Sequence, residues 1–218
     1  MTKFVFTKKH LIWLCSGLTV FVLFLGAATA VAYGVYQKRS DSSLVRALGS
    51  AYPAARVGSH VISYGDFLRS RDTLRVYLNS DAAKQAQLAG PMSLSVEKNA
   101  LDRLVRDAAV ADMAQRKNVQ VSDADVQKAF SQLMLSASTT KPDVDQYLKQ
   151  TFDWNQDQFR QYVMRPALTE QRLAQSLTTS TADQQTVVEQ AIDARLAQPD
   201  VKYYLHIEAP ADATTATP

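Results

Sequence analysis

Residues 95–135 read SVEKNALDRLVRDAAVADMAQRKNVQVSDADVQKAFSQLML, and this stretch decides the fold. Its first half repeats apolar residues at three- and four-residue steps, which predicts one buried stripe along a helix: Leu101, Leu104, Val105, Ala108 and Ala111. Charged residues lie between them, and we expect these to form a solvated opposite face: Asp102, Arg103, Arg106, Asp107 and Arg116.

Polar residues mark where this helix ends and a second helix begins. Ser95 is the predicted N-cap of the first helix, and Asn118 suits the turn that follows it. Ser122 is the predicted N-cap of the second, and Asp125 adds an acid to its first turn. The second helix has an apolar side made of Val126, Phe130, Leu133 and Met134. Two amphipathic helices joined by a short turn predict a helical hairpin that must pack against the rest of the chain.

Two segments resemble a known family. Residues 100–130, ALDRLVRDAAVADMAQRKNVQVSDADVQKAF, are similar to the helical core of the SurA N-terminal-like chaperone domain. Residues 143–173, DVDQYLKQTFDWNQDQFRQYVMRPALTEQRL, resemble the following Tyr-Leu and Phe-Arg helices of the same family. The resemblance covers roughly residues 53–208 and is typical of foldases of the SurA, PrsA and PpiD kind, which work outside the cytoplasm.

The predicted fold is mainly α. We expect an N-terminal transmembrane helix, then a SurA N-like helical domain with a small β-sheet formed by its terminal strands. The predicted segments are a cytoplasmic tail (1–10), a transmembrane anchor (11–36), a juxtamembrane connector (37–54), the helical chaperone domain (55–208) and a disordered tail (209–218). Residues 201–207, VKYYLHI, are rich in β-formers and are predicted to pair with residues 56–62.

The anchor prediction rests on the length of one apolar segment. Residues 11–36 carry no charge and exceed the ~20 residues that cross a bilayer. Ala28-Thr29-Ala30 and Ala30-Val31-Ala32 resemble signal peptidase sites, so cleavage remains an alternative to a retained anchor. Lys3, Lys8 and Lys9 favour a cytoplasmic N-terminus, and the family resemblance implies that the domain lies outside the cytoplasm.

Small residues within the anchor suggest one mode of self-association. Gly26, Ala30 and Gly34 recur at four-residue spacing, which lets two membrane helices approach closely. A homodimer through these three positions is therefore a possible partner interaction of the chain.

Charge excludes one functional class. The formal net charge is +3, and Lys3, Lys8 and Lys9 account for all of it, so the basic and acidic residues that follow balance. A nucleic-acid-binding domain normally carries a basic excess. We expect no nucleic-acid partner.

Local structure elsewhere follows from caps and prolines. Ser63 and Asp66 predict a capping box at the start of a helix, and residues 79–93 are predicted to be a loop. A further helix is expected to begin near Asn155, with Pro166 in its middle kinking or breaking it near Arg165. A short helix around Leu44, Val45 and Leu48 and a last helix through residues 187–196 complete the prediction.

No catalytic or metal-binding pattern is expected. His60 and His206 lack the accompanying ligands of a metal site, and residues 153–157, DWNQD, lack the Gly and Glu that a calcium loop requires later. A parvulin isomerase domain needs roughly a hundred residues, and the interval between Leu177 and Asp200 holds one helix. We therefore expect no cofactor and favour a protein without isomerase activity.

The predicted function is to hold unfolded or newly translocated polypeptides near the membrane, as the resemblance implies. Adaptable, flat or flexible side chains suit such a role, and the client-binding candidates are Phe130, Met134, Tyr147, Phe152, Trp154 and Tyr162. Each of these also suits a helical core. Two alternatives remain: a peptidyl-prolyl isomerase family member or remnant, and an envelope adaptor that binds one folded partner.

Overall fold

The computed structural model describes residues 26–37, 42–136, 141–178, 180 and 183–208. The chain forms two compact units, residues 1–52 and residues 53–218. The predicted tail from residue 209 and the first part of the predicted anchor, residues 11–25, lie outside the described residues.

The described part of the first unit has a helix over residues 26–36 and a second helix, α2 (Ser43–Gly49). They contact closely where glycines remove side chains. A Cβ placed on Gly34 would lie 2.8 Å from a methyl of Val45, and one on Gly49 would lie 2.7 Å from a methyl of Val35. The predicted short helix around Leu44 to Leu48 is confirmed as α2. No helix within the described residues has both the length and the apolar character to span a membrane.

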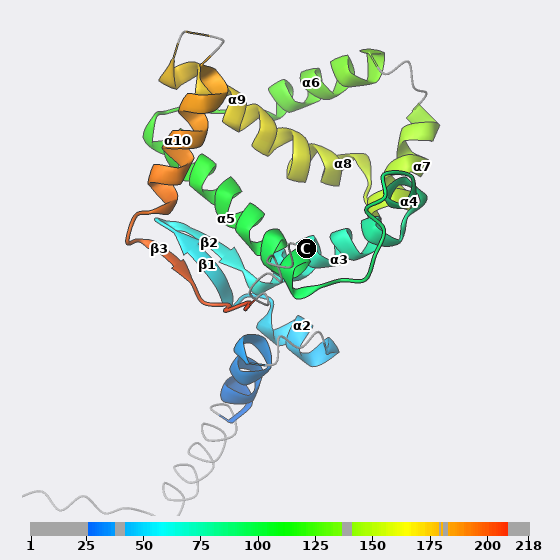
Figure 1. Ribbon diagram of the computed structural model, residues 1–218, viewed down its shortest axis with the longest axis vertical. Helices are drawn as coiled ribbons and strands as arrows, with labels where there is room; N and C mark the ends of the chain where they lie inside the picture. Colours follow the sequence, from blue (N-terminus) through cyan, green and yellow to red (C-terminus); the bar gives the residue numbers. More distant parts are fainter. Residues whose placement is uncertain (1–25, 38–41, 137–140, 179, 181–182, 209–218) are drawn as a thin grey trace, which may run out of the picture. The chain divides into compact units, whose positions relative to one another are not determined.

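The second unit is mainly helical and carries a small sheet (Figure 1). Its strands are β1 (Pro53–Val57), β2 (His60–Ser63) and β3 (Val201–Tyr203). Its helices are α3 (Tyr64–Asn79), α4 (Asp81–Gln85), α5 (Leu94–Arg116), α6 (Asp123–Ser136), α7 (Lys141–Phe152), α8 (Gln156–Phe159), the π-helical η1 (Arg160–Met164), α9 (Arg165–Leu177) and α10 (Gln184–Leu196).

The sheet has the order β2-β1-β3 and both pairs are antiparallel. Ala55 lies opposite Tyr203 and Val57 opposite Val201, so the predicted pairing of the terminal strands is confirmed at β1. The prediction extended β3 too far. The N–H groups of Tyr204 and Leu205 both donate to the carbonyl of Ala54, at 2.9 and 3.0 Å, and this shared acceptor ends the regular ladder after Tyr203.

Helix α5 lies at the centre of the second unit and contacts α3, α9, α10 and β1. Leu101 and Val105 are buried as predicted, but Leu104 is only half-buried. A further cluster of buried residues forms around Val110 of α5, with residues of α9 and α10: Leu173, Ala174, Val188 and Ile192. Because α5 has neighbours on several sides, its buried surface is wider than one stripe.

The predicted solvated face of α5 is wrong in part, because Arg106 and Asp107 are half-buried. The same helix also carries one buried acid. Asp112 is buried, and its carboxylate accepts a hydrogen bond from Arg195 Nε at 2.7 Å. Arg195 also donates to both carboxylate oxygens of Asp200, and the turn residue Gly58 lies directly over this group, since a Cβ there would come within 2.6 Å of Asp112 Oδ1. Arg106 likewise bridges Glu170 of α9 and Glu189 of α10. These ion pairs join α5 to distant helices.

Several local predictions are confirmed, and two need correction. Ser63 and Asp66 form the predicted capping box, and Ser122 caps α6 through the N–H of Asp125. The N-cap of α5 is Ser93, whose hydroxyl accepts from Val96 N–H, so the prediction of Ser95 is wrong by two residues. The predicted loop over residues 79–93 contains α4, because the hydroxyl of Ser80 caps a further helical turn.

The disturbance predicted near Arg165 is present as a π-helical turn, and Pro166 does not break the helix. The chain stays helical from α8 through α9, and the five-residue π-helical turn η1 precedes the proline. The N–H of Arg165 donates to the carbonyl of Arg160, five residues earlier. A wider turn at this point accommodates a residue that has no N–H and whose ring crowds the preceding turn.

Candidate peptide-binding groove

A groove of about 630 Å³ lies between α3, α5 and the continuous helical segment α8-η1-α9. Figure 1 shows these three segments around one side of the second unit. Most of the lining is apolar, with α3 contributing Leu74, α5 contributing Ala100 and Leu104, and the third wall contributing Val163 and Pro166. The three walls come from distant parts of the sequence.

Aromatic side chains form a connected row along this groove. The ring centroids of Phe152 and Trp154 are 5.5 Å apart, and those of Trp154 and Tyr162 are 5.9 Å apart. Tyr77 stacks on Phe152, with their ring centroids 5.6 Å apart, and continues the row beyond the groove lining. All of these rings are half-buried, so each has a packed side and an accessible side. Aromatic faces offer large, rigid contact surfaces to apolar groups.

The backbone between α7 and α8 places Trp154 at this position. Asp153 adopts a left-handed conformation with φ of 57°, and the N–H of Trp154 donates back to the carbonyl of Leu148 at 3.2 Å. This arrangement ends α7 and reverses the chain direction. Asn155 then forms a capping box with Gln158 and begins α8. Trp154 is therefore fixed between two helix ends, and its indole N–H donates to Thr73 Oγ1 of α3 at 2.9 Å.

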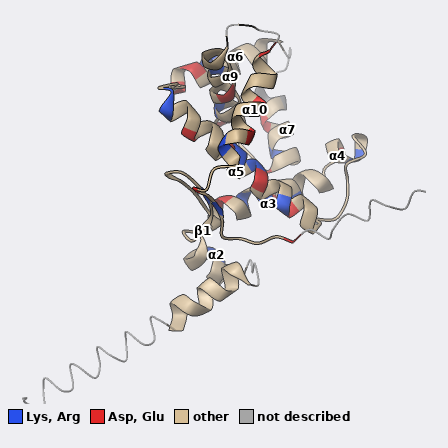
Figure 2. Ribbon diagram, turned by 60° about the vertical axis from the view of Figure 1, so that its left-hand side comes forward, with Lys and Arg blue, Asp and Glu red and all other residues tan. Residues whose placement is uncertain are grey.

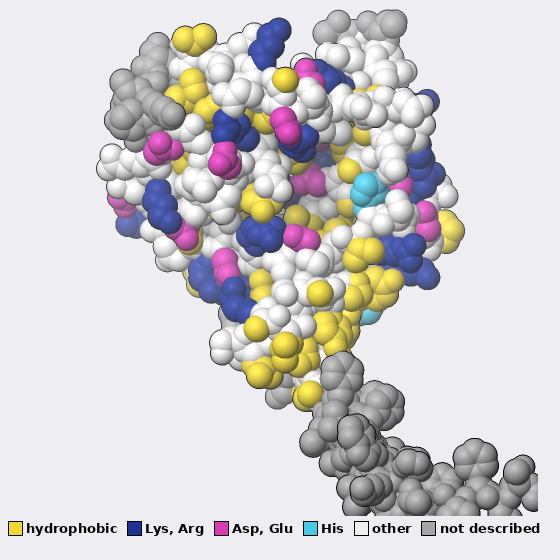
Figure 3. All heavy atoms as spheres, turned by 180° about the vertical axis from the view of Figure 1, so that it is seen from behind, with side chains coloured by type: hydrophobic (Ala, Val, Ile, Leu, Met, Phe, Trp, Pro, Cys, Tyr) yellow, Lys and Arg dark blue, Asp and Glu magenta, His cyan; other side chains and the backbone are white. Residues whose placement is uncertain are grey.

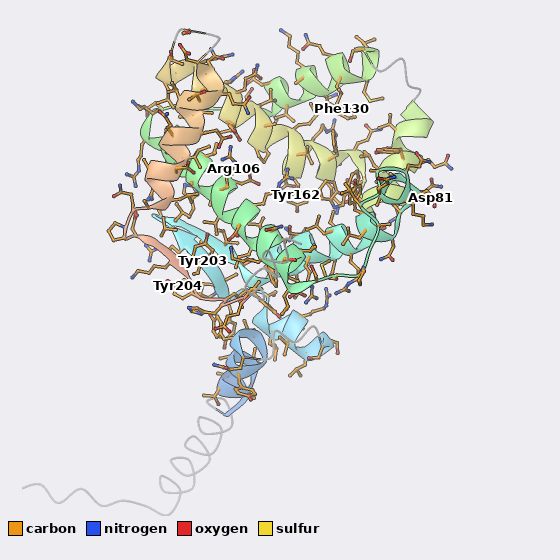
Figure 4. The ribbon with its side chains drawn as sticks, in the orientation of Figure 1. Asp81, Arg106, Phe130, Tyr162, Tyr203 and Tyr204 are labelled. Atoms are coloured by element: carbon orange, nitrogen blue, oxygen red, sulfur yellow. The ribbon has the colours of Figure 1, made fainter. Side chains whose placement is uncertain are left out.

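Tyr162 lies on the π-helical turn and points into the space between the walls (Figure 4). The guanidinium of Arg69 lies over its ring, 5.1 Å from the centroid. Arg69 forms an ion pair with Asp66, with 2.9 Å between Nη1 of Arg69 and Oδ1 of Asp66. Burial acts to raise the pKa of Asp66, but hydrogen bonds from Ser63 and Arg69 outweigh it and lower that pKa. The pair Asp66–Arg69 therefore stays charged and positions one edge of the groove.

A second acid in the lining has a different environment. Asp107 of α5 is half-buried and makes no hydrogen bond or ion pair with the described residues. Burial raises the pKa of the Asp107 carboxyl, and the opposing attraction of Arg103 does not cancel this effect. Arg103 is exposed at the mouth of the same groove.

The groove contains some of the predicted client-binding residues and not others. Phe152, Trp154 and Tyr162 line it. Phe130 is buried against Phe159 and Arg160 in the packing of α6, which suits its alternative role as a core residue. Met134 is half-exposed on α6, and Tyr147 is 53% exposed with its ring edge against Phe152. Neither Met134 nor Tyr147 lines the groove.

Sequence reasoning missed several lining residues. Leu104 belongs to the predicted apolar stripe of α5, and Leu74 lies on α3, but no sequence signal separated the accessible apolar residues from the buried ones. Phe159 was not recognised as part of a binding surface. The polar residues Thr73 and Asp107 gave no local signal, since their position in the groove depends on the packing of α3, α5 and η1.

The surroundings of the groove carry charges of both signs. Basic and acidic residues are interspersed along the helices of the second unit (Figure 2). The space-filling view from behind shows the same mixture around a hollow in the surface (Figure 3). Within the described residues, no group of three or more His, Cys, Asp and Glu side chains is arranged to hold a metal ion.

Comparison with known proteins adds one family relationship. A family model described as a SurA-like N-terminal domain matches residues 1–187, and no second domain is found. The match therefore begins earlier than the resemblance noted in the sequence, includes the apolar segment 11–36, and stops within α10. None of the curated proteins and none of the solved structures matches the chain.

Proposed function

Since the chain belongs to the family of SurA-like N-terminal domains, we propose that it is a membrane-anchored chaperone that holds unfolded or newly translocated polypeptides. Domains of this family bind unfolded clients. The proposal assigns the groove between α3, α5 and the α8-η1-α9 segment as the place where a client segment binds.

The open groove is the observation that carries the proposal. Its volume of about 630 Å³ is in the range of sites that enclose several side chains. Half-buried aromatic rings on one wall and the aliphatic Leu74 and Leu104 opposite give a surface that binds apolar groups without requiring one shape. A chaperone needs this kind of contact, because its clients share apolar side chains and no common sequence.

Membrane attachment is the second part of the proposal. Residues 11–36 are uncharged and long enough to span a bilayer, and the family match includes them. We place the N-terminus in the cytoplasm and the second unit outside it, since the tail before the segment has basic residues and no acids. Tethering would keep the groove close to polypeptides that emerge at the membrane.

An aggregation assay tests the groove directly. The full chain, in phosphatidylcholine nanodiscs, is mixed with a reduced and denatured model protein, and light scattering is followed. Wild type should suppress scattering, and the double variant Trp154→Ala/Tyr162→Ala should lose most of the suppression because it removes aromatic wall surface. Leu135→Ala is the matched control, since Leu135 is an 81% exposed hydrophobic residue of α6 outside the groove.

Two outcomes would overturn the proposal in different directions. If wild type does not suppress aggregation and crosslinks to one stoichiometric partner, the adaptor alternative is favoured. Turnover of a proline tetrapeptide in an isomerase assay would favour the enzyme alternative. Equal suppression by wild type and the groove double variant, with unfolding temperatures matched, would separate the activity from the groove.

A further inference from the structure

The acid Asp107 is the half-buried acid of the groove that has no partner group in the part of the chain that the structure describes. It lies in the lining together with Leu104, one turn away on α5, and Tyr162 of η1. It is half-buried and has no hydrogen-bond or ion-pair partner among the described residues. A carboxylate that is partly removed from water without a partner is costly, and a bound cation recovers part of that cost.

The other charges of the groove are differently placed. Asp66 is occupied by Ser63 and Arg69, and Arg69 by Asp66 and the ring of Tyr162. Arg103 is exposed at the mouth, where water solvates it. The charges of Arg106 and Glu170 also act on Asp107. These two side chains form an ion pair with each other, and Arg106 forms a second ion pair with Glu189. Asp107 is thus the charged group of the lining that remains open to a ligand.

The aromatic row adds a second attraction for the same kind of ligand. The stem of a lysine or arginine is apolar and packs on hydrophobic surface while its head group seeks an anion. Aromatic faces also attract cations, as Arg69 over Tyr162 illustrates within the groove itself. An apolar groove with one unpaired acid therefore suits a segment with both apolar and basic side chains.

We propose that the groove selects extended client segments in which an apolar or aromatic side chain packs on Trp154 and Tyr162 while a neighbouring lysine or arginine pairs with Asp107. This inference rests on the proposed chaperone function and names the class of segment that the groove prefers. Acidic segments are disfavoured, because they bring like charge to Asp107. Residues at alternate positions of an extended chain face the same side, so the basic residue lies two positions from the apolar one.

Labelled peptides of one design test the preference. The sequence X-Ser-Phe-Ser-X, within a neutral flexible context and carrying fluorescein, is made with X as lysine, norleucine or glutamate. Binding to the full chain in phosphatidylcholine nanodiscs is measured by fluorescence anisotropy, with empty nanodiscs as background. Wild type should bind the lysine peptide about tenfold more tightly than the norleucine peptide, the size expected for one charge-assisted pair, and the glutamate peptide most weakly.

Three variants assign the preference to its residue. Asp107→Asn keeps the shape of the side chain and should bind the lysine and norleucine peptides equally. Asp102→Asn is the matched control, since Asp102 is on the same helix, pairs with Lys98 and is absent from the lining, and it should keep the preference. Arg103→Gln should keep or enlarge it, because a competing cation is removed.

The result separates this inference from the function on which it rests. If wild type binds the norleucine and lysine peptides equally, the charge preference is wrong and the chaperone function stands. A thermal unfolding curve first shows that the Asp107→Asn variant is folded. If this folded variant retains the full preference for the lysine peptide, the assignment to Asp107 is wrong. If no peptide binds wild type above background, the groove function itself is refuted.

Discussion

The indole N–H of Trp154 donates a hydrogen bond to Thr73 Oγ1 over 2.9 Å and joins the α7–α8 link to α3 across 81 residues of sequence. The contact fixes the orientation of the ring that forms the middle of the aromatic row. It also crosses from one wall of the groove to another, so it links the shape of the groove to the stability of the fold.

Replacing Thr73 by valine removes the acceptor at nearly constant volume. The half-buried indole N–H then loses its partner, and we expect the free energy of unfolding to fall by about 1 kcal/mol in urea titrations. Thr73→Ser keeps a hydroxyl and should stay close to wild type. The sequence has two tryptophans, so Trp13→Phe provides a background in which emission reports Trp154 alone. Unchanged stability and emission in Thr73→Val would contradict the role of this bond.

Breaking the buried ion pair between Asp112 and Arg195 should lower the free energy of unfolding more than the loss of the Trp154–Thr73 hydrogen bond does. Arg195→Met leaves the Asp112 carboxylate buried with only the more exposed Arg116 nearby, and we expect a loss of about 3 kcal/mol in unfolding free energy. The double variant Asp112→Leu/Arg195→Met removes both charges and should lose less than the sum of the two single variants. Additive losses in the denaturation cycle would show that the two side chains do not act as a pair.

Asp107→Asn should stabilise the protein at neutral pH. Burial raises the pKa of Asp107 in the folded chain, so the ionised carboxylate disfavours the folded state when the pH lies above that pKa. We expect a gain of about 1 kcal/mol at pH 7 that disappears as the pH falls below the ordinary carboxyl pKa of about 3.9. Asp145→Asn, at an exposed position of α7, is the control. A gain that grows on acidification would have the wrong sign.

Two glycines of the first unit, Gly34 and Gly26, are expected to respond differently to substitution. Gly34 contacts Val45 of α2, whereas a Cβ on Gly26 meets nothing within 4 Å. Gly34→Leu should therefore separate α2 from the helix over residues 26–36 and speed limited tryptic cleavage after Arg46. Gly26→Leu should leave that cleavage rate unchanged and weaken any dimer formed through Gly26, Ala30 and Gly34, measured by energy transfer between labelled chains in vesicles. If Gly34→Leu is cleaved no faster than wild type, the contact between Gly34 and Val45 does not hold α2 in place.

Local rules predicted much of the fold. The caps at Ser63, Ser122 and Asn155 were predictable because a capping side chain bonds to backbone within three residues of itself. The pairing of β1 with β3 was also predictable, since both segments are rich in β-formers and flank the helices. The stripe of α5 was predicted in part, because periodicity identifies an apolar face and does not say which neighbours cover it.

The candidate site was predictable to a smaller extent. Trp154 and Tyr162 were recognised by residue type. Asp107 was expected on the solvated face of α5 and is half-buried in the groove lining. Leu104 was expected in the core and instead faces the groove. Both depend on which helices pack together, information that no local pattern contains.

The closing of the sheet by its last strand has a consequence for biogenesis. Every residue that lines the groove precedes residue 167, whereas β3 begins at Val201. Ribosomal synthesis therefore delivers the whole binding surface before the segment that ties the two ends of the unit together. A nascent chain would therefore carry every residue of the groove while its sheet still lacks β3.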